Sequence, residues 1–410
     1  MPQPAILPSA QQNDRRSASG GRSQLPYRLR LPGPVPVPER VRQAIACPNQ
    51  AHRGPEFRAI LKQAEALARP LFGTAGHVLF FASTGTGMME ASLANVLAAQ
   101  ERVLVAVQGQ FGERFAAIAR GLGADVDSID VTWGSTIDPA DIERRLGARN
   151  YRAVVVVHNE SSTGQTADLA SIGAIVRRHD ALLVVDSVSG LGGMEVRQDE
   201  WGIDIVVTAS QKALMCPPGV GMVSVSPKAW SVIRRDDRLP RFYWDFRKAH
   251  ASAEKHETAF TSATAIITGL REALTMIHEE GIERVLARHE SLSSALRAGC
   301  AALGLRRFGA GEALSNTVVA VCAPDGVDGD RIVAELSQKH RTVIGNSRNK
   351  LSGRVIRIGT MGALTSQDIV LDLHHLSLAL RDLGWACDIG EAIDAMESCL
   401  GPGAHPARCA

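Results

Sequence analysis

Two residues with complementary chemistry, Asp186 and Lys212, follow apolar runs near the middle of the sequence. The runs at 181–185 and 203–207 have the length and β-branched content of buried parallel strands. Ligands bind beside the carboxyl ends of such strands, where both side chains would project. A lysine can form a Schiff base with pyridoxal phosphate, and a carboxylate can keep its pyridine nitrogen protonated. The pair therefore indicates a pyridoxal-phosphate site, and a buried Lys–Asp pair or a surface lysine is the alternative.

A Gly/Thr-rich turn at residues 83–87 (STGTG) offers a place for a phosphate group. It lies between a predicted strand at 77–82 and a predicted helix at 88–99. The N-terminus of a helix presents unpaired N–H groups and the positive end of the helix dipole, which together bind anions. No lysine follows the last glycine, so the turn is not a Walker motif. A plain connection between a strand and a helix is the alternative.

Two further loops follow predicted buried strands and carry candidate site residues. Phe111 lies in the loop 108–112 after the strand 102–107, where its ring could stack on a flat cofactor or pack into the core. The loop 158–164 (HNESSTG) follows the strand 153–157. Its polar side chains indicate either a binding loop or a turn that satisfies its own hydrogen bonds.

The elements that must position these residues alternate between strands and helices over residues 80–225. This alternation predicts an α/β fold with a large, doubly wound, mostly parallel sheet. Beyond residue 282, helices and short strands predict a smaller α+β domain, and a chain of this length is expected to form two domains. Other strands are predicted at 125–129, 317–321, 342–344 and 354–358, and helices at 39–46, 55–71, 113–121, 168–178, 264–281, 329–338 and 366–383. The predicted organisation is a disordered tail at 1–26, a large domain with an extended N-terminal arm at 27–281, a small domain at 282–399 and a tail at 400–410.

Composition argues against several classes of protein. The formal net charge is +2 and no basic block occurs, so a nucleic-acid binder is not expected. The seven cysteines are scattered without CxxC pairs, which favours a cytoplasmic location, although an Arg/Ser-rich targeting peptide is the alternative for residues 1–26. No apolar run approaches the roughly 20 residues that span a membrane. His374 and His375 are adjacent on a predicted helix, where their side chains diverge, so no metal site is expected.

Several short motifs together resemble those of one enzyme family. The motifs are STGTGMMEA (83–91), GQFGER (109–114), HNESSTG (158–164), DSVSGLGG (186–193), DEWGIDIVVTASQKALMCPPGVG (199–221), GLREAL (269–274) and RIGTMG (357–362). In type and order they resemble fold-type I, class V aminotransferases that depend on pyridoxal 5'-phosphate, with serine–glyoxylate and alanine–glyoxylate aminotransferases the nearest in appearance. The resemblance covers about residues 30–385. It implies a fold of type I and a homodimer with shared active sites.

The resemblance also implies a role for each candidate residue. Lys212 would form the Schiff base and move the α-proton of the substrate, and Asp186 would pair with the pyridinium. Arg357 would bind the α-carboxylate of the substrate in a bidentate manner, with a surface ion pair as the alternative. The other implied cofactor contacts are Val188 and Phe111 on the two ring faces, Ser161 near the ring hydroxyl, Thr84, Gly85, Thr86 and Gln211 at the phosphate, and Thr261 at the phosphate of the neighbouring subunit.

The sequence departs from the family pattern at three places. Thr261 lacks the nearby tyrosine and the following proline that the family usually has, which puts one phosphate contact in doubt. Phe111 stands where eukaryotic members often have tryptophan, and Thr360 stands where several bacterial relatives have histidine. These differences affect the expected choice of substrate more than the chemistry.

The function that these observations favour is a ping-pong aminotransferase. A small amino acid of the serine or alanine type would donate its amino group, and glyoxylate or pyruvate would accept it. One alternative is a cysteine desulfurase or another class V lyase, which would need a histidine before the lysine and a mobile cysteine, whereas Gln211 precedes Lys212 and Cys216 is expected to be a small buried residue. The other alternative is a catalytically silent relative that acts as a binding protein.

Overall fold

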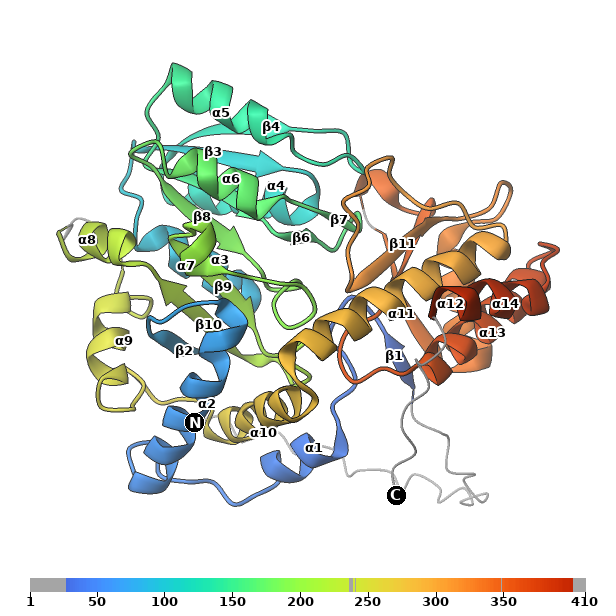
Figure 1. The fold of residues 1–410 in the computed structure, drawn as a ribbon, viewed down its shortest axis with the longest axis horizontal. Coiled ribbons are helices and arrows are strands. Elements are labelled where there is room, and N and C mark those ends of the chain that lie inside the picture. Colours follow the sequence, from blue (N-terminus) through green and yellow to red (C-terminus); the bar gives the residue numbers. More distant parts are fainter. Residues whose placement is uncertain (1–26, 236–238, 240, 348, 401–410) are drawn as a thin grey trace, which may run out of the picture.

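The computed structural model describes residues 27–235, 239, 241–347 and 349–400. The predicted tail at 1–26 and all but the first residue of the predicted tail at 400–410 lie outside this part of the chain. Leu400 is the last residue of a helix, so the prediction that the tail begins there is wrong. The described residues form a seven-stranded sheet, a four-stranded sheet and a two-stranded hairpin with helices packed around them, which confirms the α/β prediction (Figure 1). Among them, no helix combines the length and the apolar character needed to cross a bilayer.

The large sheet has the strand order β2-β10-β9-β8-β5-β3-β4. Its strands are β2 (Val78–Ser83), β3 (Arg102–Val107), β4 (Asp125–Asp130), β5 (Ala153–Val157), β8 (Leu182–Asp186), β9 (Ile205–Ala209) and β10 (Gly219–Val225). The pairs from β9 through β8, β5 and β3 to β4 are parallel, and β10 runs antiparallel to both β9 and β2. The sheet is therefore mostly parallel, as predicted, with one reversed strand near its edge.

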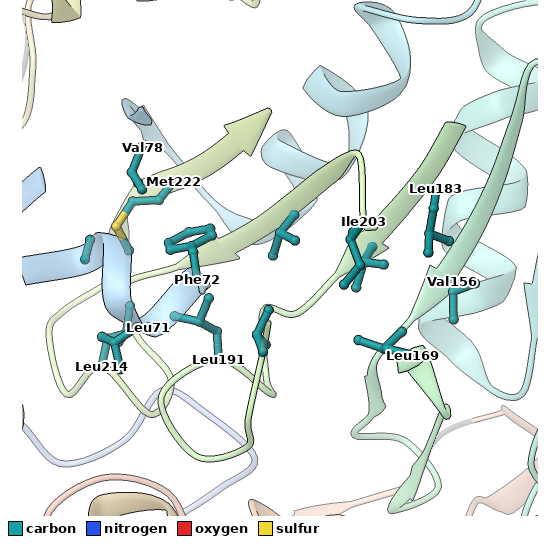
Figure 2. Packing of buried hydrophobic residues seen from close by; sticks show 14 of the residues in the cluster. Leu71, Phe72, Val78, Val156, Leu169, Leu183, Leu191, Ile203, Leu214 and Met222 are labelled. Carbon is teal, nitrogen blue, oxygen red and sulfur yellow. The ribbon is translucent and has the colours of Figure 1, made fainter. Parts of the chain in front are cut away.

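Helices cover both faces of this sheet, and each face has its own apolar core (Figure 1). The cluster in Figure 2 packs α2 (Pro55–Phe72), α5 (Pro139–Ala148), α6 (Leu169–Val176) and α10 (Thr264–Glu280) against one face. The opposite face packs against α3 (Gly85–Ala94), α4 (Gln110–Gly121), α8 (Pro227–Arg235) and α9 (Phe246–Ala253). Successive strand residues point to opposite faces, so Leu182 and Leu183 enter different cores. Burial on both faces explains why these strands are continuous apolar runs in the sequence.

The smaller sheet has the order β1-β12-β13-β11. Its strands are β1 (Arg28–Arg30), β11 (Val318–Cys322), β12 (Thr342–Asn346) and β13 (Val355–Gly359), and its helices are α11 (Ile282–Ala302), α12 (Gly329–His340), α13 (Ser366–Asp382) and α14 (Ile389–Leu400). β1 is parallel to β12, and the other pairs are antiparallel. Residues 28–30 therefore add an edge strand to a sheet that is otherwise C-terminal, whereas the sequence predicted that they belong with the large domain. The division at 281/282 stays a prediction.

The remaining elements complete the path of the chain. They are α1 (Glu39–Ile45), α7 (Gln198–Trp201), the hairpin of β6 (Asn159–Glu160) and β7 (Gln165–Thr166), and a short 3-10 helix, η1 (Asn349–Leu351). The loop 158–164 contains part of this hairpin. The segment between β1 and α1 bends at residues 31–34, where Gly33 has a φ of +95°, so the prediction of an extended arm over 31–38 is wrong for its first half. The segment connects the small sheet to α1, which packs against α10.

Candidate active site

Asp186 and Lys212 lie at the same edge of the large sheet. Asp186 is the last residue of β8 and pairs with Val207 of β9, and Lys212 follows the end of β9 by three residues. Each side chain is near enough for its charge to shift the pKa of the other, as expected for neighbouring strand ends. Burial lowers the pKa of Lys212 to about 8, although the charge of Asp186 opposes this change. The lysine amine therefore loses its proton more readily than an exposed amine.

The Asp186 carboxylate is buried, with 4% of its surface exposed. Burial raises its pKa to about 6, while the Val188 N–H and the charges of Lys212 and Arg114 lower it. The Val188 N–H donates to Asp186 Oδ1 at 2.7 Å. A protonated ring nitrogen beside this carboxylate would add a charge-assisted hydrogen bond and stabilise its ionised form.

The N-terminal segment between β1 and α1 lies directly against Lys212. Lys212 Nζ donates a hydrogen bond to the Pro32 carbonyl oxygen, and the Val35 N–H donates to the Gln211 carbonyl oxygen at 3.3 Å. A Cβ atom on Gly33 would lie 2.4 Å from Lys212 Cδ, and Gly33 has a φ of +95°. Only glycine suits this close approach in the left-handed region. The sequence predicted an extended arm here but not its contact with the lysine.

The predicted phosphate turn lies at the start of α3, which begins at Gly85 instead of the predicted residue 88. Thr84 caps this helix, since its hydroxyl accepts a hydrogen bond from the Gly87 N–H at 3.2 Å. A Cβ atom on Gly85 would lie 2.9 Å from both methyl groups of Val188, so this glycine lets the turn approach the residue two positions after Asp186. Thr86 Oγ1 accepts from Arg114 Nη1 at 2.9 Å. The turn is thus packed beside the carboxylate.

Gln211 carries a buried polar atom that lacks a hydrogen-bond partner, its side-chain oxygen Oε1. Such orphaned acceptors are uncommon in folded proteins and indicate a missing water or ligand. Gln211 lies next to Lys212, and the sequence predicted a phosphate contact for it. The unpaired Gln211 oxygen calls for a hydrogen-bond donor and so does not by itself indicate a phosphate, whereas the buried Asp186 carboxylate fits a protonated ring nitrogen.

Phe111 lies in the first turn of α4 and is half-buried. The guanidinium carbon of Arg114 lies 4.6 Å from the centroid of its ring, so one face of the ring is in contact with a cation. The N–H groups of Phe111 and Gly112 both donate to Glu160 Oε2, at 3.0 and 3.2 Å. Sequence reasoning did not select Glu160, although its motif HNESSTG follows a buried strand.

Arg357 comes from β13 of the small sheet and extends toward the large one. Its Nη1 donates to the Ser161 carbonyl oxygen at 2.8 Å, and its Nη2 donates to the Asn346 carbonyl oxygen at 2.6 Å. The positive charge of Arg357 lowers the pKa of Lys212, so the two cations are near each other. The structure thus brings Arg357 to the loop containing Ser161 and to Lys212 from a distant part of the chain.

Three other residues that the sequence singled out differ in how far they are buried. Thr261 is exposed near the start of α10. Thr360 is fully buried, and its hydroxyl donates to the Asn316 carbonyl oxygen at 2.9 Å. Cys216 is buried as expected, and burial raises the pKa of its thiol to about 12. A thiol with this pKa is a poor nucleophile near neutral pH.

A cavity of about 570 Å³ lies at the opposite, amino-terminal ends of β8 and β9. It also contains a lysine and an aspartate, and Lys228 Nζ lies 3.9 Å from Asp204 Oδ2. Asp204 accepts hydrogen bonds from the Ser226 hydroxyl at 2.6 Å and from the Leu183 N–H at 2.9 Å. We place the candidate active site at the carboxyl ends, because ligands of open α/β sheets bind there and because Arg357 adds a third charged group.

Comparison with known proteins identifies one family. The family model for class V aminotransferases matches residues 41–347. A serine–glyoxylate aminotransferase from Methylorubrum extorquens is 35% identical over 91% of this chain and 95% of its own length. A protein named as the small subunit of a soluble hydrogenase, from Synechococcus, is 37% identical over 87% of this chain and 94% of its own length. The crystal structure of ureidoglycine–glyoxylate aminotransferase from Bacillus subtilis has a TM-score of 0.88 and 32% identity, covering 91% of this chain and 97% of that one.

Proposed function

The chain belongs to the class V aminotransferase family, and we propose that it uses pyridoxal 5'-phosphate to transfer an amino group from a small amino acid to glyoxylate or pyruvate. The observation that carries this proposal is the meeting of Lys212 with Asp186 on one side and Arg357 on the other. Lys212 and Asp186 follow strands of the large sheet, and Arg357 comes from the small one. A base, an acid and a carboxylate-binding cation are what such a transfer requires.

The residues at this site fit the cofactor at both of its ends. Asp186 is suited to its ring nitrogen, and Val188 and Phe111 are suited to the two faces of the ring. Ser161 is suited to the ring hydroxyl side. The phosphate is suited to the N-terminus of α3, formed by Thr84, Gly85 and Thr86, and the side-chain NH₂ group of Gln211 would be its donor from the other side. When bound, the cofactor supplies an electron sink and carries the amino group between the two substrates.

Lys212 is suited to moving a proton because its pKa is lowered to about 8. At neutral pH a useful fraction of its Nζ is then uncharged and able to accept a proton from the α-carbon of the substrate. The Pro32 carbonyl oxygen accepts a hydrogen bond from Nζ and limits where the amine points. The close packing of Gly33 against the lysine side chain restricts the alternatives further.

Arg357 is suited to binding the α-carboxylate that amino acids and 2-oxo acids share. A guanidinium can donate two parallel hydrogen bonds to a carboxylate. The main-chain oxygens of Ser161 and Asn346 hold the Arg357 side chain beside Lys212. Both substrates can therefore use one carboxylate site in turn, which supports a ping-pong exchange. Glyoxylate as the acceptor is supported by the names of several relatives.

We also infer that two copies of the chain assemble as a homodimer with shared active sites. Phe242 and Tyr243 expose 72% and 37% of their surface to solvent. The ring of Tyr243 stacks on that of Phe260, with the ring centroids 5.1 Å apart. The Tyr243 hydroxyl donates to the Ala82 carbonyl oxygen at 3.2 Å, so this aromatic patch (Phe242, Tyr243 and Phe260) lies beside the phosphate turn and next to Thr261 in the sequence. A second copy covering the patch would bring its own Thr261 close to this turn.

Single-turnover spectroscopy tests the proposed reaction. Wild-type protein loaded with pyridoxal phosphate is expected to change its visible absorbance with serine or alanine and to recover with glyoxylate or pyruvate. Lys212→Ala is expected to slow this change by at least roughly 10²-fold, the usual size of a lost acid–base group. Lys228→Ala, which removes a lysine beside another buried carboxylate, is the matched control and should match the wild type. An unchanged, borohydride-reducible absorbance in Lys212→Ala would show that the lysine assignment is wrong.

A further inference from the structure

We propose that Glu160 is a positioning residue that fixes Phe111 and Arg357 relative to each other through one buried carboxylate. This inference rests on the proposed roles of Phe111 as a ring-stacking group and Arg357 as a carboxylate-binding group. Glu160 contacts neither a substrate nor the proton-transfer lysine in this scheme. It acts through the helix that carries Phe111 and through the loop whose carbonyl holds Arg357.

The first turn of α4 depends on a cap from another part of the chain. The first N–H groups of a helix have no partner within it, and a local side chain usually accepts from them. The N-cap residue of α4 is Gly109, which has no side chain to do so. The Gln110 N–H instead donates to Ser162 Oγ at 3.0 Å, and the N–H groups of Phe111 and Gly112 donate to Glu160 Oε2 at 3.0 and 3.2 Å. Three successive amides of the helix are therefore bound by the loop that follows β5.

The second oxygen of the carboxylate holds this loop in place. Glu160 Oε1 accepts from the Ser162 N–H at 3.2 Å and also from the Ser162 hydroxyl. The same hydroxyl accepts from Gln110, so it links the loop to the helix. Ser161 lies between Glu160 and Ser162 in the sequence, and its carbonyl oxygen accepts from Arg357 Nη1 at 2.8 Å. One side chain thus connects the aromatic residue on α4 to the guanidinium from β13.

Gly109 provides the space that this arrangement needs. A Cβ atom on Gly109 would lie 2.4 Å from Glu160 Cγ, 2.6 Å from Glu160 Cδ and 2.5 Å from Ser162 Oγ. The backbone of Gly109 is extended, with φ 170°, so the need for glycine is one of space and not of conformation. The Glu160 carboxylate occupies the position that a local capping side chain would otherwise take.

Hydrogen bonds and the helix dipole oppose the electrostatic cost of burying the Glu160 carboxylate. Glu160 is fully buried, and burial raises its pKa to about 7, while the Ser162 hydroxyl and the amides of Gly112, Ser162 and Phe111 lower it. The positive end of the α4 dipole also favours a negative charge here.

Glu160→Gln is the sharpest test, because its amide oxygen can still accept from the helix but its NH₂ group cannot accept from Ser162. In protein without cofactor, the amides of Phe111 and Gly112 are expected to exchange with solvent roughly tenfold faster, because a neutral amide oxygen accepts more weakly than the carboxylate does. In the loaded enzyme, KM for the amino acid is expected to rise roughly tenfold while kcat changes less, because the placement of Arg357 is disturbed. Ser162→Ala, which removes the acceptor of the Gln110 N–H and leaves the bonds of Glu160 to Phe111 and Gly112, should speed exchange at residue 110 and raise the KM less.

Asp168→Asn is the matched control. Asp168 caps α6 by accepting from the Ser171 N–H at 3.0 Å and from the Ser171 hydroxyl, on an exposed surface away from the site. Asp168→Asn should leave unchanged both the amide exchange of residues 110–112 and the KM for the amino acid. Unaltered exchange in Glu160→Gln, or a KM equal to that of the control, would overturn the proposal. Because exchange is measured without cofactor, it separates this inference from the proposed function, which fails instead if wild-type protein transfers no amino group.

Discussion

At the scale of single residues, the site holds two buried ionisable groups whose pKa values move toward each other. Burial lowers the pKa of Lys212 to about 8 and raises that of Asp186 to about 6. The change at Lys212 favours the uncharged amine that proton transfer requires. The change at Asp186 opposes the charged form that a pyridinium would require. Asp186 thus reduces the stability of the protein without cofactor, and a cation bound beside it would offset that loss.

Asp186→Asn is accordingly expected to stabilise the protein without cofactor at pH 7. The folded pKa of Asp186 is about 6 and its ordinary value is 3.8, so keeping the buried carboxylate ionised above pH 6 costs stability. Asparagine keeps an oxygen for the Val188 N–H and removes the charge. The gain in the free energy of unfolding should be roughly 1–3 kcal/mol at pH 7. It should shrink as the pH falls from 6 to 3.8 and vanish below, where wild-type Asp186 is protonated in both states.

Urea unfolding across this pH range measures the effect. Asp180→Asn, an identical change at an exposed position, controls for net charge. The explanation is wrong if Asp186→Asn is less stable than the wild type at pH 7. It is also wrong if its advantage does not depend on pH. The same variant should bind pyridoxal phosphate more weakly, which would separate the functional cost from the gain in stability.

At the scale of elements, the strand β1 connects the small sheet to the lysine of the large one. Asp372 of α13 is buried and accepts from Arg30 Nε at 3.0 and 2.8 Å and from Arg28 Nη2 at 2.7 Å. The chain then continues to Pro32 and Gly33, which contact Lys212. A group of ion pairs at one end of this segment therefore determines where its other end lies.

Asp372→Ala is expected to destabilise the protein by about 3–5 kcal/mol, because it leaves the buried guanidinium of Arg30 without this carboxylate. Urea unfolding measures the loss. Glu143→Ala breaks the exposed pair with Arg178 and should cost less than 1 kcal/mol. Hydrogen exchange of residues 28–35 should also quicken in Asp372→Ala, since the segment loses its anchor. Equal effects of the two substitutions would contradict the anchoring role.

At the scale of the whole molecule, the candidate site lies where the two sheets meet and beside an exposed aromatic patch. Arg357 reaches Lys212 only because the two sheets lie beside each other (Figure 1). On the outside of the large sheet, Phe242 and Tyr243 expose aromatic rings next to the phosphate turn. Exposed aromatic groups of this kind are typical of interfaces between proteins. The proposed dimer would bury them and complete the phosphate end of the site.

Phe242→Glu is expected to weaken the dimer by at least about 30-fold, the equivalent of roughly 2 kcal/mol at an interface hot spot. The variant should still fold, because Phe242 is 72% exposed and Lys248 Nζ lies 3.8 Å from its ring centroid on the surface. Sedimentation velocity and pyridoxal phosphate titration measure assembly and binding. Tyr27→Glu, at an exposed aromatic on the small sheet side, should behave as the wild type. Unchanged sedimentation of Phe242→Glu would exclude the patch from the interface.

Elements whose signal is local could be predicted from the sequence. The apolar runs of β3 and β5 coincide with the observed strands, because strands buried on both faces have no polar residues to interrupt them. The positions of Asp186 and Lys212 at one edge of the sheet could also be predicted, because the parallel strands β8 and β9 end on the same side. Several elements were missed; among them, β1 is rich in arginine, β10 contains two glycines, and α14 was read only as part of the small domain. Each of these forms mainly because it packs against a distant element.

The sequence by itself determined the family of this protein and the chemistry expected of it, through a lysine and an aspartate at neighbouring strand ends, a turn predicted to bind phosphate, and motifs shared with one family. Only the tertiary structure decided what surrounds those groups. Burial of Glu160 depends on amides of α4 that lie about fifty residues away in the sequence, and the Pro32 carbonyl oxygen that contacts Lys212 precedes it by 180 residues. No local pattern encodes such contacts, because the free energy of a buried polar group depends on partners that folding brings to it.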